Sequence, residues 1–490
     1  MMAQIEQFLA AFSSFMWGTP LVMLLVGGGL FFAVRSRFRP YLFFGHAIDL
    51  LRGKYDDPDD PGDINHFQAL SSALAATVGL GNISGVAVAI FMGGPGAVFW
   101  MWISALLGVA TKFFTCTLAI LYRGKDSRGH LQGGPMYVII EGLGKRWRPL
   151  AILFALGGLF GPLPIFQSNQ LTQILRDVIY APLGWGGGGG GGGVMSGGVM
   201  SGIADSGVAE GVAGSVAAGG DFFLANLLTG LVLATLVSFV IFGGIKKIGR
   251  VAARMVPGMV LLYVGSVLVI LAVHITDIPA TFALILTDAF TAQAALGGAV
   301  GEVIRIGIQR GAFSNEAGIG TAPLAHGAAK TKEPVREGLV AMLGPVIDTI
   351  LICTMTALAI LVTGVWQGTD DNGITMTLLA FTDVYGAAGS YILVLSVVIF
   401  AISSMLTYSY FGTKCLGFLI GAERQHYYNY FYVLMIIFGS VASIDAVINL
   451  IDGMFAVMAI PTILSAVFLS GKVRDVSKEY LDRVIRGNAG

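Results

Sequence analysis

Long apolar stretches, separated by short polar segments, dominate the pattern of hydrophobic and polar positions along the chain. A helix rises about 1.5 Å per residue, so about twenty apolar residues cross a hydrocarbon layer of roughly 30 Å. The stretches of sufficient length cover residues 15–34, 67–92, 95–122, 149–180, 221–243, 255–275, 295–329, 337–363, 390–419, 427–443 and 447–470. The pattern therefore predicts an all-α polytopic membrane protein, embedded in a lipid bilayer, with about eleven transmembrane helices.

Positive charge is distributed unevenly among the segments that connect these stretches. When the connecting segments are assigned alternately to the two sides of a membrane, nearly all of the 29 lysines and arginines fall on one side. The exceptions lie inside the apolar stretches and are Lys112, Arg176, Arg305 and Arg310. Because cytoplasmic loops are enriched in lysine and arginine, we expect an inner-membrane protein with its N-terminus outside and its C-terminus in the cytoplasm.

The composition excludes several other classes of protein. Only 12% of residues are charged and 55% are hydrophobic, whereas about 25% of residues are charged in soluble domains. The net charge is zero, which gives no reason to expect a nucleic-acid partner. The three cysteines lack the spacing of a disulfide framework or zinc site, and there is no H-E-x-x-H motif or P-loop. We therefore expect neither an enzyme nor a protein with a bound cofactor.

The stretches divide into one extra N-terminal helix, in residues 1–40, and two units of five spans, in residues 67–275 and 295–470. Because the first unit has an odd number of spans, the second inserts upside down and forms an inverted repeat. Residues 41–66 are predicted to be a cytoplasmic amphipathic segment, and residues 471–490 a cytoplasmic tail. The glycine-rich residues 184–220 are predicted to form a flexible external loop, not a nucleotide site, because no strand precedes them.

The first span of each unit contains residues that weaken a helix at mid-membrane. The sequence is TVGLGN at residues 77–82 and GAFSNEAGIGT at residues 311–321. Lipid cannot satisfy freed backbone groups, so such breaks must be buried in protein or line a cavity. Taken singly, either segment is as well explained by small residues that let helices pack closely. Together, broken helices at the start of two inverted units are typical of secondary transporters that bind substrate between the breaks.

Residues 93–108, GGPGAVFWMWISALLG, resemble the signature of the alanine-or-glycine:cation symporter family. Residues 311–320, 348–358 and 452–461 also match, so the resemblance covers roughly residues 60–470. It implies a leucine-transporter-like inverted repeat and sodium-coupled symport of alanine or glycine, with Na⁺ as the coupling ion. The substrate contacts implied by the resemblance are Thr77, Gly79, Gly81, Gln167, Phe313 and Asn315. This chain departs from the family pattern at Thr115, Tyr408, Phe455 and Thr462, so a different small amino acid stays open.

A zwitterionic substrate in such a cavity needs partners for both of its charged ends. We expect the half-helix that starts near Ile83 to direct N–H groups at the carboxylate, and carbonyls near Gln309 to accept from the ammonium. Asn82, just before this half-helix, is a further predicted substrate contact. Phe313 and Tyr408 would bound the side-chain pocket. For sodium, we expect an oxygen site made of the Ser403 and Ser404 hydroxyls with the backbone of Ala75 and Val78. For each serine, bonding back to its own helix is an equally good explanation.

Ionisable side chains inside the spans are costly in lipid and are therefore functional candidates. Lys112, Glu302, Arg305, Glu316 and Asp348 are predicted to form internal ion pairs or gates, with Arg310 as a sixth member. Glu316 lies within the second break. If Glu316 or Asp348 titrates during the cycle, the coupling ion is a proton and not sodium. A channel or a non-transporting amino acid sensor is the alternative class of function.

Overall fold

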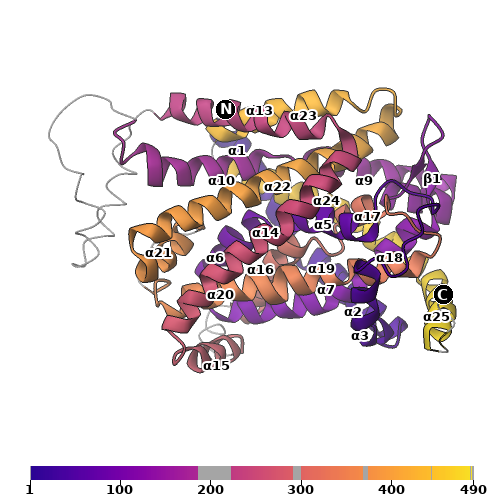
Figure 1. Ribbon diagram of the computed structural model, residues 1–490, viewed down its shortest axis with the longest axis horizontal. Coiled ribbons are helices and arrows are strands. Elements are labelled where there is room, and N and C mark those ends of the chain that lie inside the picture. The colour runs from indigo at the N-terminus through magenta and orange to yellow at the C-terminus, as the bar shows by residue number, and fades with distance from the viewer. Residues whose placement is uncertain are drawn as a thin grey trace.

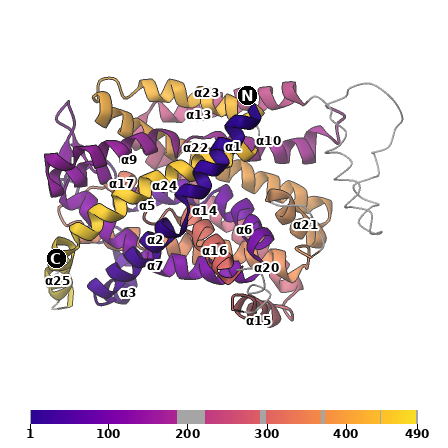
Figure 2. The same ribbon diagram turned by 180° about the vertical axis from the view of Figure 1, so that it is seen from behind.

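The structure is a computed structural model that describes residues 2–185, 222–290, 299–367, 373–442, 444–485 and 487. Apolar helices run alongside one another in a single bundle (Figures 1 and 2). Figure 1 shows β1 and α25 at one end of this bundle, and α15 and α21 towards the other. Nearly all of the glycine-rich segment 184–220 lies outside the described residues, so its predicted flexibility stays a prediction.

The helices and strands follow the predicted apolar stretches closely. The first half of the chain contains α1 (Met2–Met16), α2 (Thr19–Arg35), α3 (Arg39–Leu42), α4 (Phe44–Leu51), α5 (His66–Thr77), α6 (Leu80–Gly93), α7 (Gly96–Leu121), β1 (Gly124–Lys125), β2 (Leu131–Gln132), α8 (Pro135–Tyr137), η1 (Val138–Leu143), η2 (Lys145–Trp147), α9 (Arg148–Phe160), α10 (Ile165–Leu175), η3 (Arg176–Tyr180), α13 (Phe223–Ile241), α14 (Gly244–Val273) and α15 (Ile278–Asp288). The second half contains α16 (Ala299–Asn315), α17 (Thr321–His326), α18 (Pro334–Ala341), α19 (Leu343–Pro345), η4 (Val346–Cys353), α20 (Thr354–Val362), α21 (Ile374–Tyr385), α22 (Ala387–Ile420), α23 (Tyr427–Val441), α24 (Ile444–Phe468) and α25 (Ser470–Ile485).

The all-α membrane class is confirmed. Within the described residues, 8 helices are long and apolar enough to cross a membrane, or 9 if the bent pair α5–α6 is one span. The two other predicted spans correspond to α23, which has 15 residues, and to α16 with α17. Helix α16 has 17 residues and α17 has 6, so neither is long enough by itself to be counted. The number eleven therefore stays a prediction.

The last helix of each predicted unit packs against a helix of the other unit. Helix α14 of the first predicted unit packs against α22 of the second, and α24 of the second packs against α9 of the first. Helices α13 and α23, the fourth of each unit, pack against each other and run side by side along one edge in both views (Figures 1 and 2). Two equivalent units related by a pseudo-two-fold axis produce this exchange of contacts.

Both predicted helix breaks are present. Helices α5 and α6 are bent by 41° at Val78 and Gly79, and α16 and α17 are separated by residues 316–320. Helix α6 packs on α16 and α5 packs on α17, so the two interruptions lie together inside the bundle. The second break is shorter than the predicted one, because Gly311 is still helical. A methyl group on Gly311 would lie 2.9 Å from Ser104 Cβ, so this glycine serves close packing against α7.

Candidate functional site

The first break is shaped by one side-chain amide. Asn82 Oδ1 accepts from the Gly79 N–H at 2.9 Å, and the Asn82 N–H bonds to the Gly79 carbonyl. In a regular helix these two N–H groups would bond to the carbonyls of Ala75 and Val78. The interruption therefore leaves the Ala75 and Val78 carbonyls without their regular helical donors. They are the two carbonyls that the sequence predicts for the cation.

The predicted cation ligands of α22 lie next to this break. Ser403 and Ser404 both donate to the carbonyl of Phe400, at 2.9 and 3.1 Å, which is the back-bonding alternative. A methyl group on Gly79 would nevertheless lie 2.5 Å from Ser404 Oγ, so the Ser404 hydroxyl touches the interrupted backbone. The oxygens of Ser404 and the freed carbonyls are the hard ligands that an alkali cation prefers. The residues present therefore fit a sodium ion.

The second break contains a buried carboxylate. Glu316 is 1% exposed and has φ +52°, a left-handed backbone conformation that non-glycine residues rarely adopt. One carboxylate oxygen accepts from the Tyr408 hydroxyl at 2.5 Å, and the other accepts from the Thr321 hydroxyl. The two hydrogen bonds satisfy the carboxylate and hold Tyr408 of α22 against the break.

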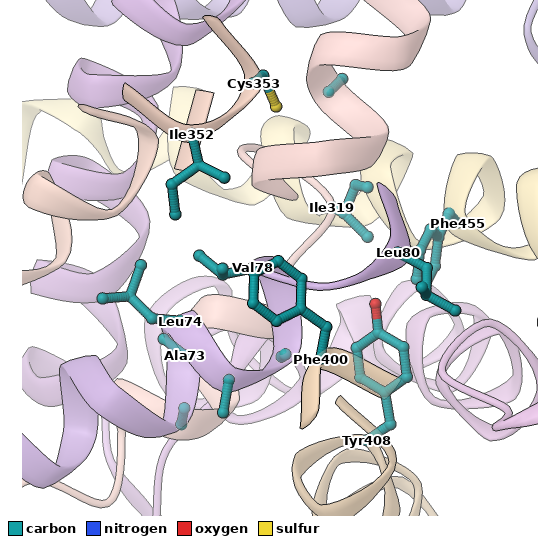
Figure 3. Close-up of a cluster of buried hydrophobic side chains, with 14 of the residues drawn as sticks. Ala73, Leu74, Val78, Leu80, Ile319, Ile352, Cys353, Phe400, Tyr408 and Phe455 are labelled. Atoms are coloured by element: carbon teal, nitrogen blue, oxygen red, sulfur yellow. The ribbon is translucent and has the colours of Figure 1, made fainter. Parts of the chain in front are cut away.

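Aromatic side chains enclose the region between the breaks. The ring of Phe313 lies 6.0 Å from that of Phe166 and 5.7 Å from that of Phe455, and Tyr408 lies 6.4 Å from Phe455. Figure 3 shows Tyr408 and Phe455 close to Leu80, the first residue of α6 after the first break. A methyl group on Gly81 would lie 3.6 Å from the Phe313 ring. The structure thus places Gly79 beside Ser404 and Gly81 beside Phe313, and both Phe313 and Tyr408 pack on Phe455. Their roles in binding stay predictions.

Two predicted substrate contacts turn away from this aromatic region. Asn82 donates to Asp348 Oδ1 at 2.8 Å, and Asn315 donates to Thr349 Oγ1 at 3.2 Å. Asp348 also accepts from Ser314 and Thr349, both at 2.8 Å. Asn82 and Asn315 therefore anchor the two breaks to η4, which carries Asp348 and Thr349. The predicted carbonyl end near Gln309 is also wrong, because α16 continues to Asn315.

Thr77 and Gln167 have unusual surroundings for buried polar residues. Their side chains are 5% and 6% exposed, and neither Thr77 Oγ1 nor Gln167 Oε1 has a hydrogen-bond partner among the described residues. Thr77 is the last residue of α5 at the first break. Gln167 follows Phe166, whose ring contacts Phe313. Buried polar atoms are normally paired, so these oxygens suit a polar ligand.

The ionisable residues of the spans fall into three groups. Glu302 and Arg305 pair with each other on α16 and are partly exposed. The buried ammonium of Lys112 interacts electrostatically with Asp348 and Glu316. The remaining group centres on Asp452, an acidic residue inside the apolar stretch 447–470 that is not among the predicted ionisable candidates. Its carboxylate accepts from Arg310 and Gln309, both at 3.3 Å.

A bundle of apolar helices with two buried breaks that meet beside an oxygen-lined region defines a secondary transporter. A model of the sodium:alanine symporter family matches residues 2–489, and the chain belongs to that family. The chain is 38% identical to the sodium/alanine symporter AgcS of Methanococcus maripaludis, over 96% of this chain and 95% of that protein. It is 32% identical to the probable sodium/glutamine symporter GlnT of Bacillus subtilis, over 97% and 91% of the two chains.

A solved structure supports the fold independently. MhsT in complex with L-phenylalanine matches with a TM-score of 0.57 at 13% identity, over 85% of this chain and 98% of that chain. The two proteins therefore share a fold. With the family assignment, this confirms that the protein is a multi-pass membrane transporter, a cation-coupled amino acid symporter and not an enzyme.

Proposed function

We propose that the protein couples sodium entry to the uptake of a small neutral amino acid, alanine or glycine, by alternating access. The observation that carries this proposal is a pair of buried oxygens that have no hydrogen-bond partner among the described residues. One belongs to Thr77, at the end of α5 beside the first break, and the other to Gln167, next to Phe166 whose ring contacts Phe313. A zwitterion satisfies such a site, because its ammonium donates and its carboxylate accepts hydrogen bonds.

The breaks supply partners for both ends of the substrate. Helix α6 begins at Leu80, so its first N–H groups and the positive end of its dipole suit the carboxylate. Helix α16 ends at Asn315, so its last carbonyls suit the ammonium. The Thr77 hydroxyl and the Gln167 carbonyl oxygen are acceptors for the remaining ammonium protons. No charged side chain is needed for either end.

The aromatic side chains favour a small substrate. Phe313 and Phe455 have ring centroids 5.7 Å apart, so they already pack against each other and leave the substrate side chain little room. This favours glycine or alanine. The glutamine symporter among the relatives makes a longer polar side chain the alternative to test.

Sodium is the proposed coupling ion, bound by the Ala75 and Val78 carbonyls with Ser404 and Ser403. Entry of one ion is worth about 2.3 kcal/mol per 100 mV and about 1.4 kcal/mol per tenfold gradient. Together these give roughly 3.7 kcal/mol, enough for an accumulation of several hundredfold. Proton coupling is the second candidate, because Glu316 places a fully buried carboxylate in the second break.

Purified protein in vesicles provides the test. Uptake of labelled alanine, glycine, serine and glutamine is measured with an inward sodium gradient, with a pH gradient in the absence of sodium, and with neither gradient. We expect saturable accumulation of alanine or glycine with sodium only. Accumulation driven by the pH gradient alone would favour the proton alternative, and gradient-independent leakage would indicate a channel. Binding without accumulation would indicate a sensor.

A further inference from the structure

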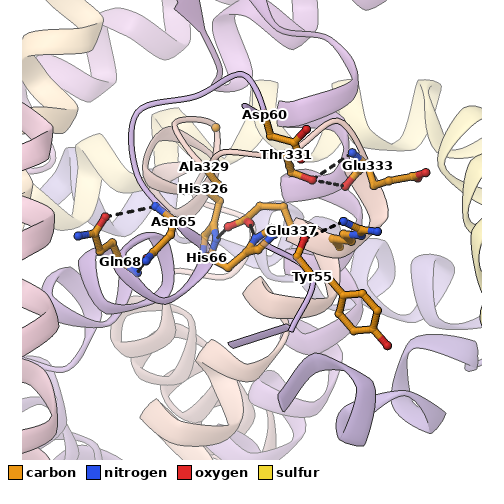
Figure 4. Close-up of polar contacts among 12 residues, drawn as sticks. Tyr55, Asp60, Asn65, His66, Gln68, His326, Ala329, Thr331, Glu333 and Glu337 are labelled. Atoms are coloured by element: carbon orange, nitrogen blue, oxygen red, sulfur yellow. Dashed lines mark hydrogen bonds and ion pairs between the residues drawn. The ribbon is translucent and has the colours of Figure 1, made fainter. Parts of the chain in front are cut away.

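A buried carboxylate between two imidazoles joins three helices at the end of the bundle that the charge pattern assigns to the cytoplasm (Figure 4). His66 begins α5, His326 ends α17, and Glu337 lies in the first turn of α18. Nδ1 of each histidine contacts a different carboxylate oxygen of Glu337. All three residues are at most 1% exposed. One carboxylate thus connects both broken helices to α18.

Backbone contacts join α5 and α17 to each other without Glu337. Ile64 and Ala329 form a parallel β-bridge, and the Lys330 N–H donates to the Ile64 carbonyl at 2.7 Å. The Arg123 guanidinium donates to the carbonyls of Gly327 and Ala329. The chain segments before α5 and after α17 therefore form one unit. Glu337 is the side chain through which both imidazoles hold this unit against α18.

The charge of this cluster depends on one proton. Glu337 with two neutral imidazoles has a charge of −1, whereas one imidazolium makes the cluster neutral, which burial favours. The other ionisable groups that interact with the cluster come from α18, from the loop before α5, and from α7 and the segment after it: Arg336, Asp56, Cys116 and Arg123. Arg336 and Asp56 oppose each other near His66. The Arg123 guanidinium donates hydrogen bonds to backbone carbonyls and interacts electrostatically with Asp60 and Asp63.

The two histidines are not equivalent. The side chain of His66 is 2% exposed and that of His326 is 0% exposed. Nε2 of His326 has no hydrogen-bond partner among the described residues. A second N–H on His326 would therefore be a buried donor without an acceptor, which costs more than an unpaired acceptor nitrogen at the same place. His66 is thus the better site for the proton, and His326 orients Glu337.

We propose that His66, His326 and Glu337 form a proton-binding latch that holds α5, α17 and α18 together. One proton stays on His66 while the latch is closed, and passes to water when α5 separates from α18 and the ion pair with Glu337 breaks. This proposal rests on the proposed function in one respect: alternating access requires this end of the bundle to open. The ligand proposed is a proton, because Nδ1 of each histidine faces a carboxylate oxygen of Glu337. No group of three or more His, Cys, Asp or Glu in the described residues is arranged to hold a metal ion.

The sign of the pH effect follows from the ion pair. The imidazolium is favoured in the closed latch, where Glu337 is adjacent, and less favoured in the open one. Below about pH 6.5, the ordinary midpoint of histidine, His66 is protonated in both states and opening does not depend on pH. Above this value the closed latch binds one proton more, so opening becomes easier by up to tenfold per pH unit.

A native thiol reports on opening. Cys116 of α7 is fully buried and packs with Ala322 of α17 and Ala341 of α18, so a reagent reaches it only when these helices separate. We suggest measuring the alkylation rate of Cys116 in the purified full-length protein between pH 6.5 and 8.5, by peptide mass spectrometry. Rates are divided by that of a small-molecule thiol at the same pH. Neither substrate nor sodium is needed, so a failure of the proposed function would not affect this test.

We expect the corrected rate to rise with pH in the wild-type protein and to lose this dependence in His66→Gln and Glu337→Gln. His130→Gln is the matched control, because this side chain is 74% exposed and lies outside the cluster; it should behave as wild type. A pH-independent corrected rate in the wild-type protein would overturn the latch. An unchanged slope in both variants would overturn it as well. If both variants misfold, the wild-type slope alone still decides.

Discussion

Both helix breaks interrupt the regular backbone hydrogen bonds of a helix, but different groups stabilise them. The first, at Val78 and Gly79, contains no charged residue and is stabilised by the Asn82 amide. The second, at residues 316–320, contains three residues of positive φ and a buried carboxylate that accepts two hydrogen bonds. The first break thus leaves backbone groups free for ligands, whereas the second is held in shape by its own side chains. Substitutions should therefore affect binding at the first break and folding at the second.

The same substitution just after the first break, in the first turn of α6, and within the second break tests this contrast most directly. Gly320 has φ +104°, and a methyl group on it would lie 2.4 Å from Thr462 Oγ1. Gly320→Ala should therefore cost about 2–4 kcal/mol of stability, through a strained backbone and a clash. Gly81→Ala places its methyl group 3.6 Å from Phe313 and should fold normally, but the methyl group enters the substrate site. We expect at least a tenfold loss of uptake.

Thermal unfolding of the purified proteins and vesicle uptake at matched protein levels separate the two effects. If Gly81→Ala lowers the unfolding temperature as much as Gly320→Ala does, the two breaks do not differ in the way described.

Thr77→Val should have the next largest effect, a loss of substrate affinity. Valine has the shape of threonine but lacks the hydroxyl, which is buried and has no hydrogen-bond partner among the described residues. Stability should therefore change by less than about 0.5 kcal/mol. A lost hydrogen bond to a charged ammonium is worth about 1.5–3 kcal/mol, so substrate affinity should fall about ten- to hundredfold. Thr117→Val is the control, because the Thr117 hydroxyl bonds within its own helix. Equal affinities of wild type and Thr77→Val would remove Thr77 from the site.

Ser404→Ala should change the response to sodium more than the response to amino acid. Loss of one oxygen ligand should raise the sodium concentration for half-maximal uptake by about three- to tenfold, a loss of roughly 1 kcal/mol. Ser409→Ala is the matched control, because this buried serine of the same helix bonds to the Leu406 carbonyl. Titration of uptake with sodium at fixed alanine measures the shift. Identical curves for both variants would mean that back-bonding is the whole role of Ser404.

Tyr408→Phe should have the smallest effect on transport and should act on the second break. The change removes one of the two hydrogen bonds to the Glu316 carboxylate, so we expect a loss of stability of about 1–3 kcal/mol. The phenyl ring remains beside Phe455, so the preference between glycine and alanine should stay the same. Denaturation of the purified variant measures the loss of stability. Competition between glycine and alanine for uptake measures the substrate preference. A changed substrate preference would mean that the Tyr408 hydroxyl contacts the substrate.

The sequence alone determined the membrane class, most of the spans and both breaks, because these depend on properties of neighbouring residues. Whether an apolar stretch is long enough to cross a bilayer does not depend on what it packs against. Likewise, the glycines in TVGLGN or AGIG weaken a helix in any surroundings. The same local reasoning placed the second break five residues too early. Gly311 weakens a helix by itself, but its close packing against Ser104 keeps that turn helical.

Only the tertiary structure decided which side chains share a site. Asn82 and Asn315 are predicted substrate contacts, yet they bond to Asp348 and Thr349 on a distant helix. The latch of His66, His326 and Glu337 joins residues up to 271 positions apart, and no spacing rule connects them. The physical reason is that a buried polar group must find a partner wherever packing brings one. That choice depends on the whole bundle and not on the neighbouring residues.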